Sequence, residues 1–193
     1  MSKSSVKMAL ICLFSAGLAV AGAAAQDTTD PRSLSQSQLE ALYFDAARAG
    51  RIDLLDGLIR SGLKVDARDS RGYTSLILAA YAGQLKTVEF LISHGADPCA
   101  FDPKRNSSLM AVAFKGETRI AERLLKEHCD VNAANNMGQT ALMMAAMFGR
   151  LDVAKLLLAH GANPALKDTA GNTATSLARQ QGNDEMIVLV EKK

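Results

Sequence analysis

The sequence predicts an all-α solenoid of about five helix-turn-helix repeats, preceded by a targeting segment and a short lead-in. Three observations predict this architecture. A residue pattern recurs at an interval of 33 residues, each copy carries apolar residues at helical spacing, and glycines separate the helical stretches. Composition agrees, because 48% apolar and 22% charged residues are typical of a globular chain.

The first 25 residues have the pattern of a cleavable secretory signal peptide. Lys3 and Lys7 precede an uncharged stretch that starts at Met8 and ends in small residues typical of a cleavage site before Gln26. The alternative is an uncleaved inner-membrane anchor that leaves the protein facing the periplasm, because this stretch nearly reaches a membrane-spanning length. Its second half is Gly and Ala, which are weakly apolar and favour cleavage. The short signal suggests bacterial export, and hence the periplasm.

The segment 26–38 is polar and contains Pro31, which predicts a flexible lead-in to a repeat domain over 39–193. Removal of Lys3 and Lys7 leaves 20 of the 22 basic residues against 20 acidic ones, so the mature chain is near neutral. A neutral chain lacks the basic field that attracts phosphates. We therefore expect no nucleic-acid partner.

The predicted repeats are residues 39–68, 69–101, 102–134, 135–167 and 168–193, of which the first is a divergent copy. Their register comes from positions that recur every 33 residues. A carboxylate or amide residue is followed by a hydroxyl residue and then by a glycine. These positions are Asp69, Asp102, Asn135 and Asp168; Thr74, Ser107, Thr140 and Thr173; and Gly83, Gly116, Gly149 and Gly182.

Each copy has the pattern of a turn, a helix, a second turn and a second helix. The hydroxyl residue can cap the first helix by accepting hydrogen bonds from its unpaired amides. The second helix carries apolar residues at helical spacing, as in Val88, Leu91 and Ile92. Gly95 and Gly161 follow where a left-handed helix end is needed. The repeated carboxylates are expected to organise the backbone of the turns.

Two segments of the fourth repeat resemble ankyrin repeats most closely: 138–146, with the sequence GQTALMMAA, and 160–163, with the sequence HGAN. The resemblance covers 39–193 and implies antiparallel helix pairs with hairpin-like fingers along one edge. Arg105 and His128 replace glycines in the third repeat, which predicts an irregular finger and helix end there. Thr175 and Arg179 replace core residues in the last repeat, as expected of a polar terminal cap.

The sequence contains no catalytic constellation, so we predict a protein that is not an enzyme and needs no cofactor, metal or small-molecule substrate. A Gly-x-Ser-x-Gly turn, a HExxH motif and a phosphate-binding glycine loop are all missing. His94 and His160 occupy one repeat position two repeats apart. Helices pack about 8–10 Å apart, so their imidazoles should lie on the order of 20 Å from each other, too far for a shared metal. We expect both to be surface or capping histidines.

Cys99 and Cys129 lie in the turns of neighbouring repeats. Their even number, in a compartment that permits disulfides, favours a bond between them. A disulfide needs its Cα atoms within about 7 Å. Cys99 does not align with Cys129, because it lies three positions after the residue that corresponds to Cys129 in the second repeat. We therefore expect two buried or partly buried thiols, with a disulfide as the alternative.

Two surface strips are candidate protein-binding sites. In ankyrin-like repeats, the last two residues of the first helix are not needed for stacking. In the middle repeats of this chain they form a mostly apolar ladder, and in the first and last repeats the ladder position is Arg48 and Gln180. An apolar centre with a polar rim is typical of an interface. The alternative is that these side chains pack against the next helix. The ladder residues are Tyr81, Phe114, Lys115, Met147 and Phe148, and the second strip, on the fingers, comprises Arg71, Tyr73, Lys104, Arg105 and Met137.

The finger cations would make one edge locally basic, although solvated turn charges explain them equally well. Among the methionines at 110, 143, 144 and 147, we expect only Met147 to lie outside the core.

The resemblance also suggests partners, which we expect to be periplasmic proteins. Some exported bacterial ankyrin proteins resemble inhibitors that protect their producer from its own cell-wall or lipid hydrolases. Others resemble accessory proteins that support a periplasmic catalase against peroxide. A rigid concave surface suits the blocking of an active-site mouth, which favours inhibition. A scaffold or membrane-tethered adaptor that retains its N-terminal segment is a further alternative.

Overall fold

The computed structural model describes residues 34–191, and this range contains ten helices that follow one another in pairs. The segment predicted to be a signal peptide, 1–25, and most of the predicted lead-in lie outside the described residues. The helices are α2 (Gln36–Ala49), α3 (Ile52–Arg60), α4 (Ser75–Tyr81), α5 (Leu85–Ser93), α6 (Ser108–Lys115), α7 (Thr118–Leu124), α8 (Ala141–Met147), α9 (Leu151–Ala159), α10 (Ala174–Gln180) and α11 (Asp184–Glu191).

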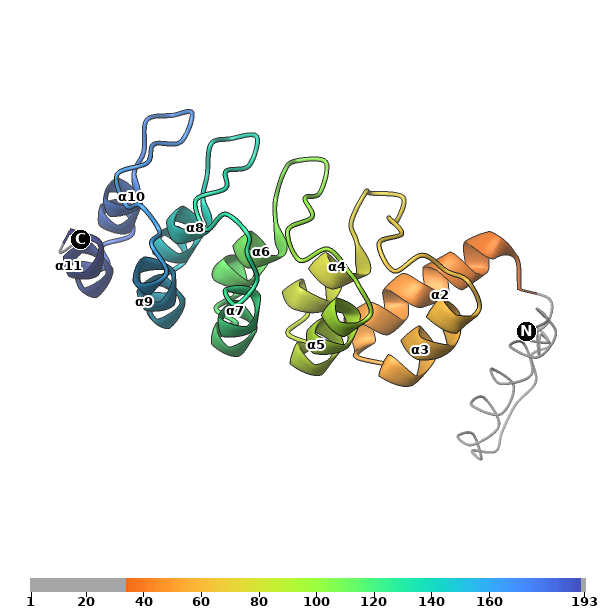
Figure 1. Cartoon of the computed structure of the whole chain (residues 1–193). Helices are drawn as coiled ribbons and strands as arrows, with labels where there is room; N and C mark the ends of the chain where they lie inside the picture. The colour runs from red at the N-terminus through yellow and green to blue at the C-terminus, as the bar shows by residue number, and fades with distance from the viewer. Residues whose placement is uncertain (1–33, 192–193) are drawn as a thin grey trace, which may run out of the picture.

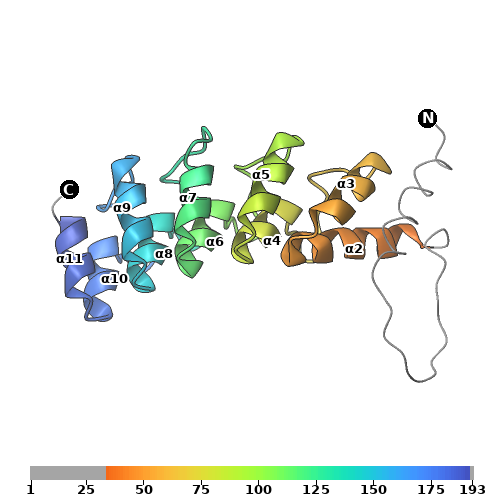
Figure 2. The ribbon, with the colours of Figure 1, turned by 90° about the horizontal axis from the view of Figure 1, so that it is seen from below.

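The helix pairs stack side by side in one row, with a hairpin-like finger before each pair from the second onward (Figure 1). The first helices contact one another in sequence from α2 to α10, and the second helices do so from α3 to α11. Seen from below, the first and second helices of the middle repeats lie in separate layers (Figure 2). This arrangement confirms the predicted all-α solenoid, with the core between the layers.

Small and apolar residues at the repeated positions explain why the helices stack so closely. Ala79 and Ala80 in α4, like Ala145 and Ala146 in α8, are fully buried where neighbouring first helices meet. Leucines of the second helices, such as Leu91, are fully buried between the layers. Burial of such side chains supplies most of the stabilisation of an isolated row of short helices.

The predicted N-caps of the first helices are confirmed. Each hydroxyl accepts a hydrogen bond from the amide three residues later, at 3.2 or 3.3 Å. The bond satisfies one of the four amides that a helix N-terminus leaves unpaired. The capping residues are Thr74, Ser107, Thr140 and Thr173.

The repeated carboxylates and amide organise the fingers, as predicted. In the third repeat, Asp102 Oδ1 accepts hydrogen bonds from the backbone amides of Lys104 and Asn106, both at 2.8 Å. Asn135 makes the equivalent pair of bonds at 2.9 and 3.0 Å in the fourth repeat. One side-chain oxygen therefore holds each finger in shape.

The expectation of an irregular third finger is wrong, whereas the irregular helix end is confirmed. Arg105 adopts the left-handed conformation that glycine holds in the other fingers, with φ of 61°, so the finger keeps its shape at a cost in strain. Where His128 replaces glycine, α7 ends at Leu124, two positions earlier in the repeat than α5 and α9.

The ordered region begins earlier than the predicted boundary between 26–38 and 39–193. Helix α2 starts at Gln36, so the last three residues of the predicted lead-in are helical. Ser35 and Gln38 form a capping box, in which Ser35 Oγ accepts from the Gln38 amide and Gln38 Oε1 accepts from the Ser35 amide. These reciprocal bonds fix the helix start.

Candidate protein-binding site

An aromatic strip runs along the ends of the middle first helices. Tyr81 of α4 stacks on Phe114 of α6, with ring centroids 6.0 Å apart and planes 12° apart. Phe114 meets Phe148, the residue after α8, edge to face at 4.4 Å. The Lys115 ammonium lies 5.1 Å from the Tyr81 ring centroid, a cation–π contact. Tyr81 is 50% and Phe148 39% exposed, so the strip presents aromatic surface to solvent.

Met147, a residue of the predicted ladder, is less exposed than its neighbour Phe148. Met147 is half-buried and packs against the hydrophobic core, whereas Phe148 contacts the neighbouring aromatic ring. Met144, which we expected to fill the core, is half-buried and lines an open groove. Both methionines pack against the core and are buried to a similar degree, while Met110 and Met143 are buried as expected.

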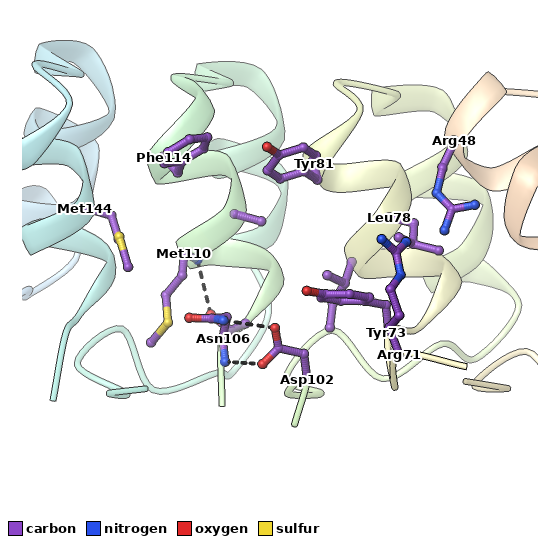
Figure 3. Close-up of a pocket in the computed structure, with 13 residues that line it drawn as sticks. Arg48, Arg71, Tyr73, Leu78, Tyr81, Asp102, Asn106, Met110, Phe114 and Met144 are labelled. Carbon is purple, nitrogen blue, oxygen red and sulfur yellow. Dashed lines mark hydrogen bonds between the residues drawn. The ribbon is translucent and has the colours of Figure 1, made fainter. Parts of the chain in front are cut away.

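A groove of about 550 Å³ lies between the aromatic strip and the bases of the fingers of the second and third repeats. Figure 3 shows Tyr81 and Phe114 along one side, Tyr73 and Asp102 along the other, and Met110 between them. Sequence reasoning missed this groove. Its signal was Ala111, which stands where the second repeat has Leu78 and the fourth has Met144. The small side chain leaves space between two larger ones.

Two guanidinium groups stand at the N-terminal end of the groove and share one carboxylate. Asp69 Oδ2 lies 3.2 Å from Arg48 Nη2 and 3.4 Å from Arg71 Nη2. Burial alone would raise the pKa of Asp69. Hydrogen bonds from the amides of Tyr73 and Arg71, together with the Arg71 guanidinium, outweigh burial and lower this pKa. Arg71 also lies 5.1 Å from the Tyr73 ring centroid, and both side chains line the groove.

The other finger residues divide between structure and exposure. Arg105 lies over the Phe101 ring of its own finger at 4.6 Å. Lys104 is exposed, and its carbonyl oxygen accepts a 3.0 Å bond from the Asn136 amide of the next finger. Met137 is 54% exposed, so it remains available as a contact residue. The predicted finger strip is thus split, with Arg71 and Tyr73 at the groove and the others further along the edge.

The junction between the fingers of the second and third repeats is built differently from the later finger junctions. Backbone bonds join the later fingers, but Pro103 stands at the position of the donor Asn136 and has no amide hydrogen. Pro103 instead packs on Gly72, where an added Cβ would come within 2.4 Å of the Pro103 Cγ. Arg68 bridges the junction, because its Nη1 donates to the carbonyl oxygens of Gly72 and Phe101.

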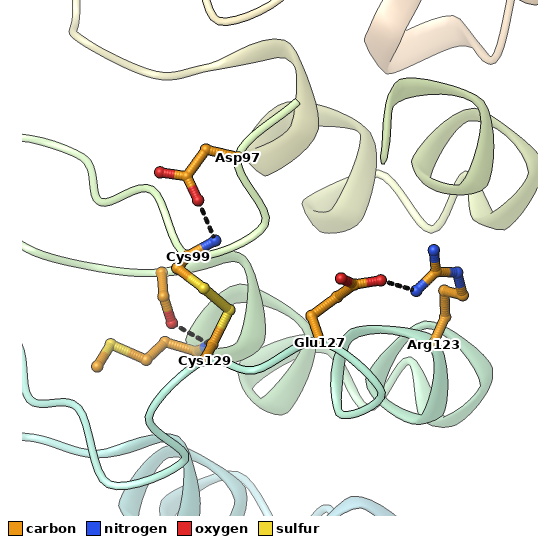
Figure 4. Close-up of a disulfide and its surroundings, with 7 residues drawn as sticks. Asp97, Cys99, Arg123, Glu127 and Cys129 are labelled. Atoms are coloured by element: carbon orange, nitrogen blue, oxygen red, sulfur yellow. Dashed lines mark hydrogen bonds and ion pairs between the residues drawn. A yellow bond between two sulfur atoms is a disulfide. The ribbon is translucent and has the colours of Figure 1, made fainter. Parts of the chain in front are cut away.

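On the opposite side of the same junction, Cys99 and Cys129 form a disulfide, with their Cα atoms 5.3 Å apart (Figure 4). The expectation of two separate thiols is therefore wrong. The reason is the way in which neighbouring turns overlap. The side chain at position 99 points to the turn of the next repeat. There it meets the residue 30 positions later, and not the residue 33 positions later that aligns with it.

The flanking junctions show the same overlap with hydrogen bonds. Asp66 and Asn132 hold the position of Cys99 in the turns that follow α3 and α7. Asp66 accepts from the amide of Asp97 at 3.1 Å, and Asn132 accepts from that of Asn163 at 2.8 Å. The disulfide thus replaces a repeated hydrogen bond at the junction beside the irregular end of α7.

His94 and His160 cap second helices, as predicted. Each Nδ1 donates to the carbonyl oxygen four residues earlier at 2.8 Å, and both side chains are exposed. Over residues 34–191, no group of three or more His, Cys, Asp or Glu side chains is arranged to hold a metal ion. Within the same range, no helix combines the length and apolar character needed to cross a bilayer.

The family model for ankyrin repeats (3 copies) matches residues 9–102 and 103–193. The chain belongs to the ankyrin repeat family. No match to it is found among the curated proteins. As an ankyrin-repeat protein, it carries a module for protein–protein interaction, and the aromatic strip with its groove is the candidate surface.

Proposed function

We propose that this ankyrin-repeat protein is an exported, non-enzymatic binding protein that holds one partner protein along its aromatic strip. The observation that carries the proposal is the contact of Tyr81, Phe114 and Phe148 across three consecutive repeats. Aromatic side chains that touch one another and remain exposed lose little conformational entropy on binding. Such residues are enriched at the energetic centres of interfaces.

Two features support export to the periplasm. The first is the signal-like pattern of residues 1–25, with Lys3 and Lys7 before an uncharged stretch. The second is the disulfide between Cys99 and Cys129, since disulfides persist in oxidising compartments such as the periplasm and are rare in the cytosol. Cleavage before Gln26 would remove the third cysteine, Cys12, and leave a mature chain whose cysteines are all paired.

For the partner, we propose a periplasmic hydrolase that the protein inhibits to protect its producer. A row of stacked repeats is rigid, and the strip and groove lie on one continuous face of first helices. A rigid, recessed aromatic surface suits the coverage of an active-site mouth, because little ordering is needed on binding. Support of a periplasmic catalase and a membrane-tethered scaffold are the outcomes to be distinguished from inhibition.

The test is in-cell crosslinking followed by pull-down from periplasmic extract, using the tagged full chain. A Tyr81→Glu/Phe148→Glu variant places two charges on the strip at its most exposed rings. Val188→Glu is the matched control, because Val188 is 49% exposed on α11, in the last repeat. Circular dichroism should show the same helix content for all three proteins.

A hydrolase recovered with wild type and Val188→Glu, and lost with the double variant, would support the proposal if the purified protein also inhibits that enzyme. Recovery of a catalase would favour the accessory role. Equal recovery with the strip variant would contradict the strip as the binding surface. N-terminal sequencing settles the tether, because a mature chain that starts at Gln26 carries no N-terminal anchor.

A further inference from the structure

We infer that the groove beside the aromatic strip binds an extended segment of the partner protein in which a large apolar side chain is adjacent to a carboxylate. This inference rests on the proposed function and specifies the chemistry that the partner must present. The groove would take the apolar side chain, and Arg71 at its end would take the carboxylate (Figure 3).

The apolar half of the inference follows from the walls of the groove. They comprise Leu78, Met110, Ala111 and Met144 from three neighbouring first helices, with Tyr81 and Phe114 above them. Ala111 is the short side chain in the row, so the space over it is bounded by larger apolar groups on both sides. A leucine-, methionine- or phenylalanine-like side chain in this space would complete the row.

The acidic half follows from the charges that the groove leaves available. Its lining contains two guanidinium groups, Arg48 and Arg71, and one carboxylate, Asp102. Arg48 is already paired with two carboxylates, Asp45 at 2.8 Å and Asp69 at 3.2 Å. Asp102 is 5% exposed and already accepts from two backbone amides and the Asn106 side chain, so its charge is satisfied within its own finger. Arg71, by contrast, is 63% exposed and makes one 3.4 Å contact with the shared Asp69. It retains donors for a carboxylate in the fork geometry that arginine favours.

A protein segment fits these features better than a small molecule does. Small-molecule pockets surround their ligand and aim several unsatisfied polar groups at it. Here Asp102 and Asn106 are bonded to each other, and the groove is continuous with the exposed ring of Tyr81 and the half-buried ring of Phe114. The free donors stand at one end, where they would set the direction of a bound chain.

The experiment selects binders from a phage library that displays random peptides of about twelve residues, which span the groove when extended. The bait is the immobilised, oxidised full chain. Enriched peptides are synthesised, and their affinities are measured by fluorescence anisotropy against wild type, Ala111→Leu and Arg71→Glu. Lys155→Glu is the control for a charge reversal, because Lys155 is exposed on α9, in the other layer.

The expected consensus is one large apolar residue beside Asp or Glu. Ala111→Leu, which copies the side chain of Leu78, should weaken binding by about tenfold or more, as the loss of an anchor contact does. Arg71→Glu should shift the preference from acidic toward basic peptides, and Lys155→Glu should change neither. Arg71→Gln gives a second reading if Ala111→Leu lowers helix content, since it should abolish the acidic preference alone.

The inference is overturned if no peptide is enriched, if the consensus lacks an acidic residue, or if the affinities are the same for wild type, Ala111→Leu and Arg71→Gln. These outcomes are separate from failure of the proposed function. A partner that is captured by wild type and Ala111→Leu, and lost only with the strip variant, would leave the strip as the interface and remove the groove from it.

Discussion

Removal of the Cys99–Cys129 disulfide gives the sharpest test of how the second and third repeats are held together. The variant is Cys99→Ala/Cys129→Ala. Alanine is the natural residue at the position of Cys129 in the second and fourth repeats, where Ala96 and Ala162 are buried. The substitution therefore removes the covalent link with little change in local packing.

The expected loss of stability follows from the loop that the disulfide closes. The two cysteines are 30 residues apart in sequence. Loop-closure entropy for a cross-link of this span corresponds to about 3.6 kcal/mol at 25 °C. A loss of this size is large against the 5–15 kcal/mol that is typical of a whole domain.

A second variant, Cys99→Asn/Cys129→Ala, separates the covalent link from the junction itself. Asparagine is present at this position as Asn132, where it accepts a hydrogen bond from the turn of the next repeat. The same bond, to the Asp130 amide, should restore about 1 kcal/mol relative to the alanine variant. Asp66→Ala is the matched control for loss of a hydrogen-bonded junction elsewhere.

The assay is urea unfolding followed by circular dichroism, with and without a dithiol reductant. Wild type should be more stable than either double variant only when it is oxidised, and reductant should leave the variants unchanged. Equal stability of oxidised wild type and the alanine variant would refute the reasoning. So would an asparagine variant no more stable than the alanine one, because the hydrogen-bonded junctions would then not be equivalents of the disulfide.

Three further predictions concern single positions. Ser108 Oγ is buried with no hydrogen-bond partner among the described residues, and Ala141 holds the equivalent position, so Ser108→Ala should raise the free energy of unfolding by about 1 kcal/mol in urea; a loss would show that the hydroxyl is satisfied. Both Arg105→Gly and Arg105→Ala remove the contact with the Phe101 ring, but only glycine also relieves the left-handed strain. The free energy of unfolding in urea should therefore be about 1 kcal/mol higher for the glycine variant than for the alanine variant, and equal values would refute the strain. Because the pKa of Asp69 is lowered on folding, its ionised form stabilises the protein above about pH 4, and this stabilisation is lost as the pH falls through the folded pKa. In Asp69→Asn, the new amide oxygen should accept the same two backbone bonds as Asn135 does in its own finger. The pH dependence of thermal unfolding below pH 4 should become weaker in this variant, and an unchanged profile would place the acid sensitivity elsewhere.

The features that were predictable from the sequence are those that depend on one repeat and its own period. A hydroxyl that accepts a hydrogen bond from the amide three residues later acts over a single turn. So does a carboxylate that accepts from the amides two and four residues later. The caps at Thr74 and Thr140 and the finger bonds of Asp102 were accordingly predicted from spacing alone. The irregular end of α7 was likewise local, since it follows from His128 in place of glycine.

What only the tertiary structure decided lies between repeats. The turns of adjacent repeats overlap with an offset of 30 or 31 residues and not 33, which brings Cys99 to Cys129 and was not visible in the aligned frame. The contact between Phe114 and Phe148 likewise depends on how the ends of neighbouring first helices pack. The groove arises because Ala111 is short where its neighbours are long, and the aligned repeats show this difference in size but not the open space that it leaves once the helices pack side by side. Periodicity within the chain therefore determined the fold, and the packing of neighbouring repeats determined the candidate site.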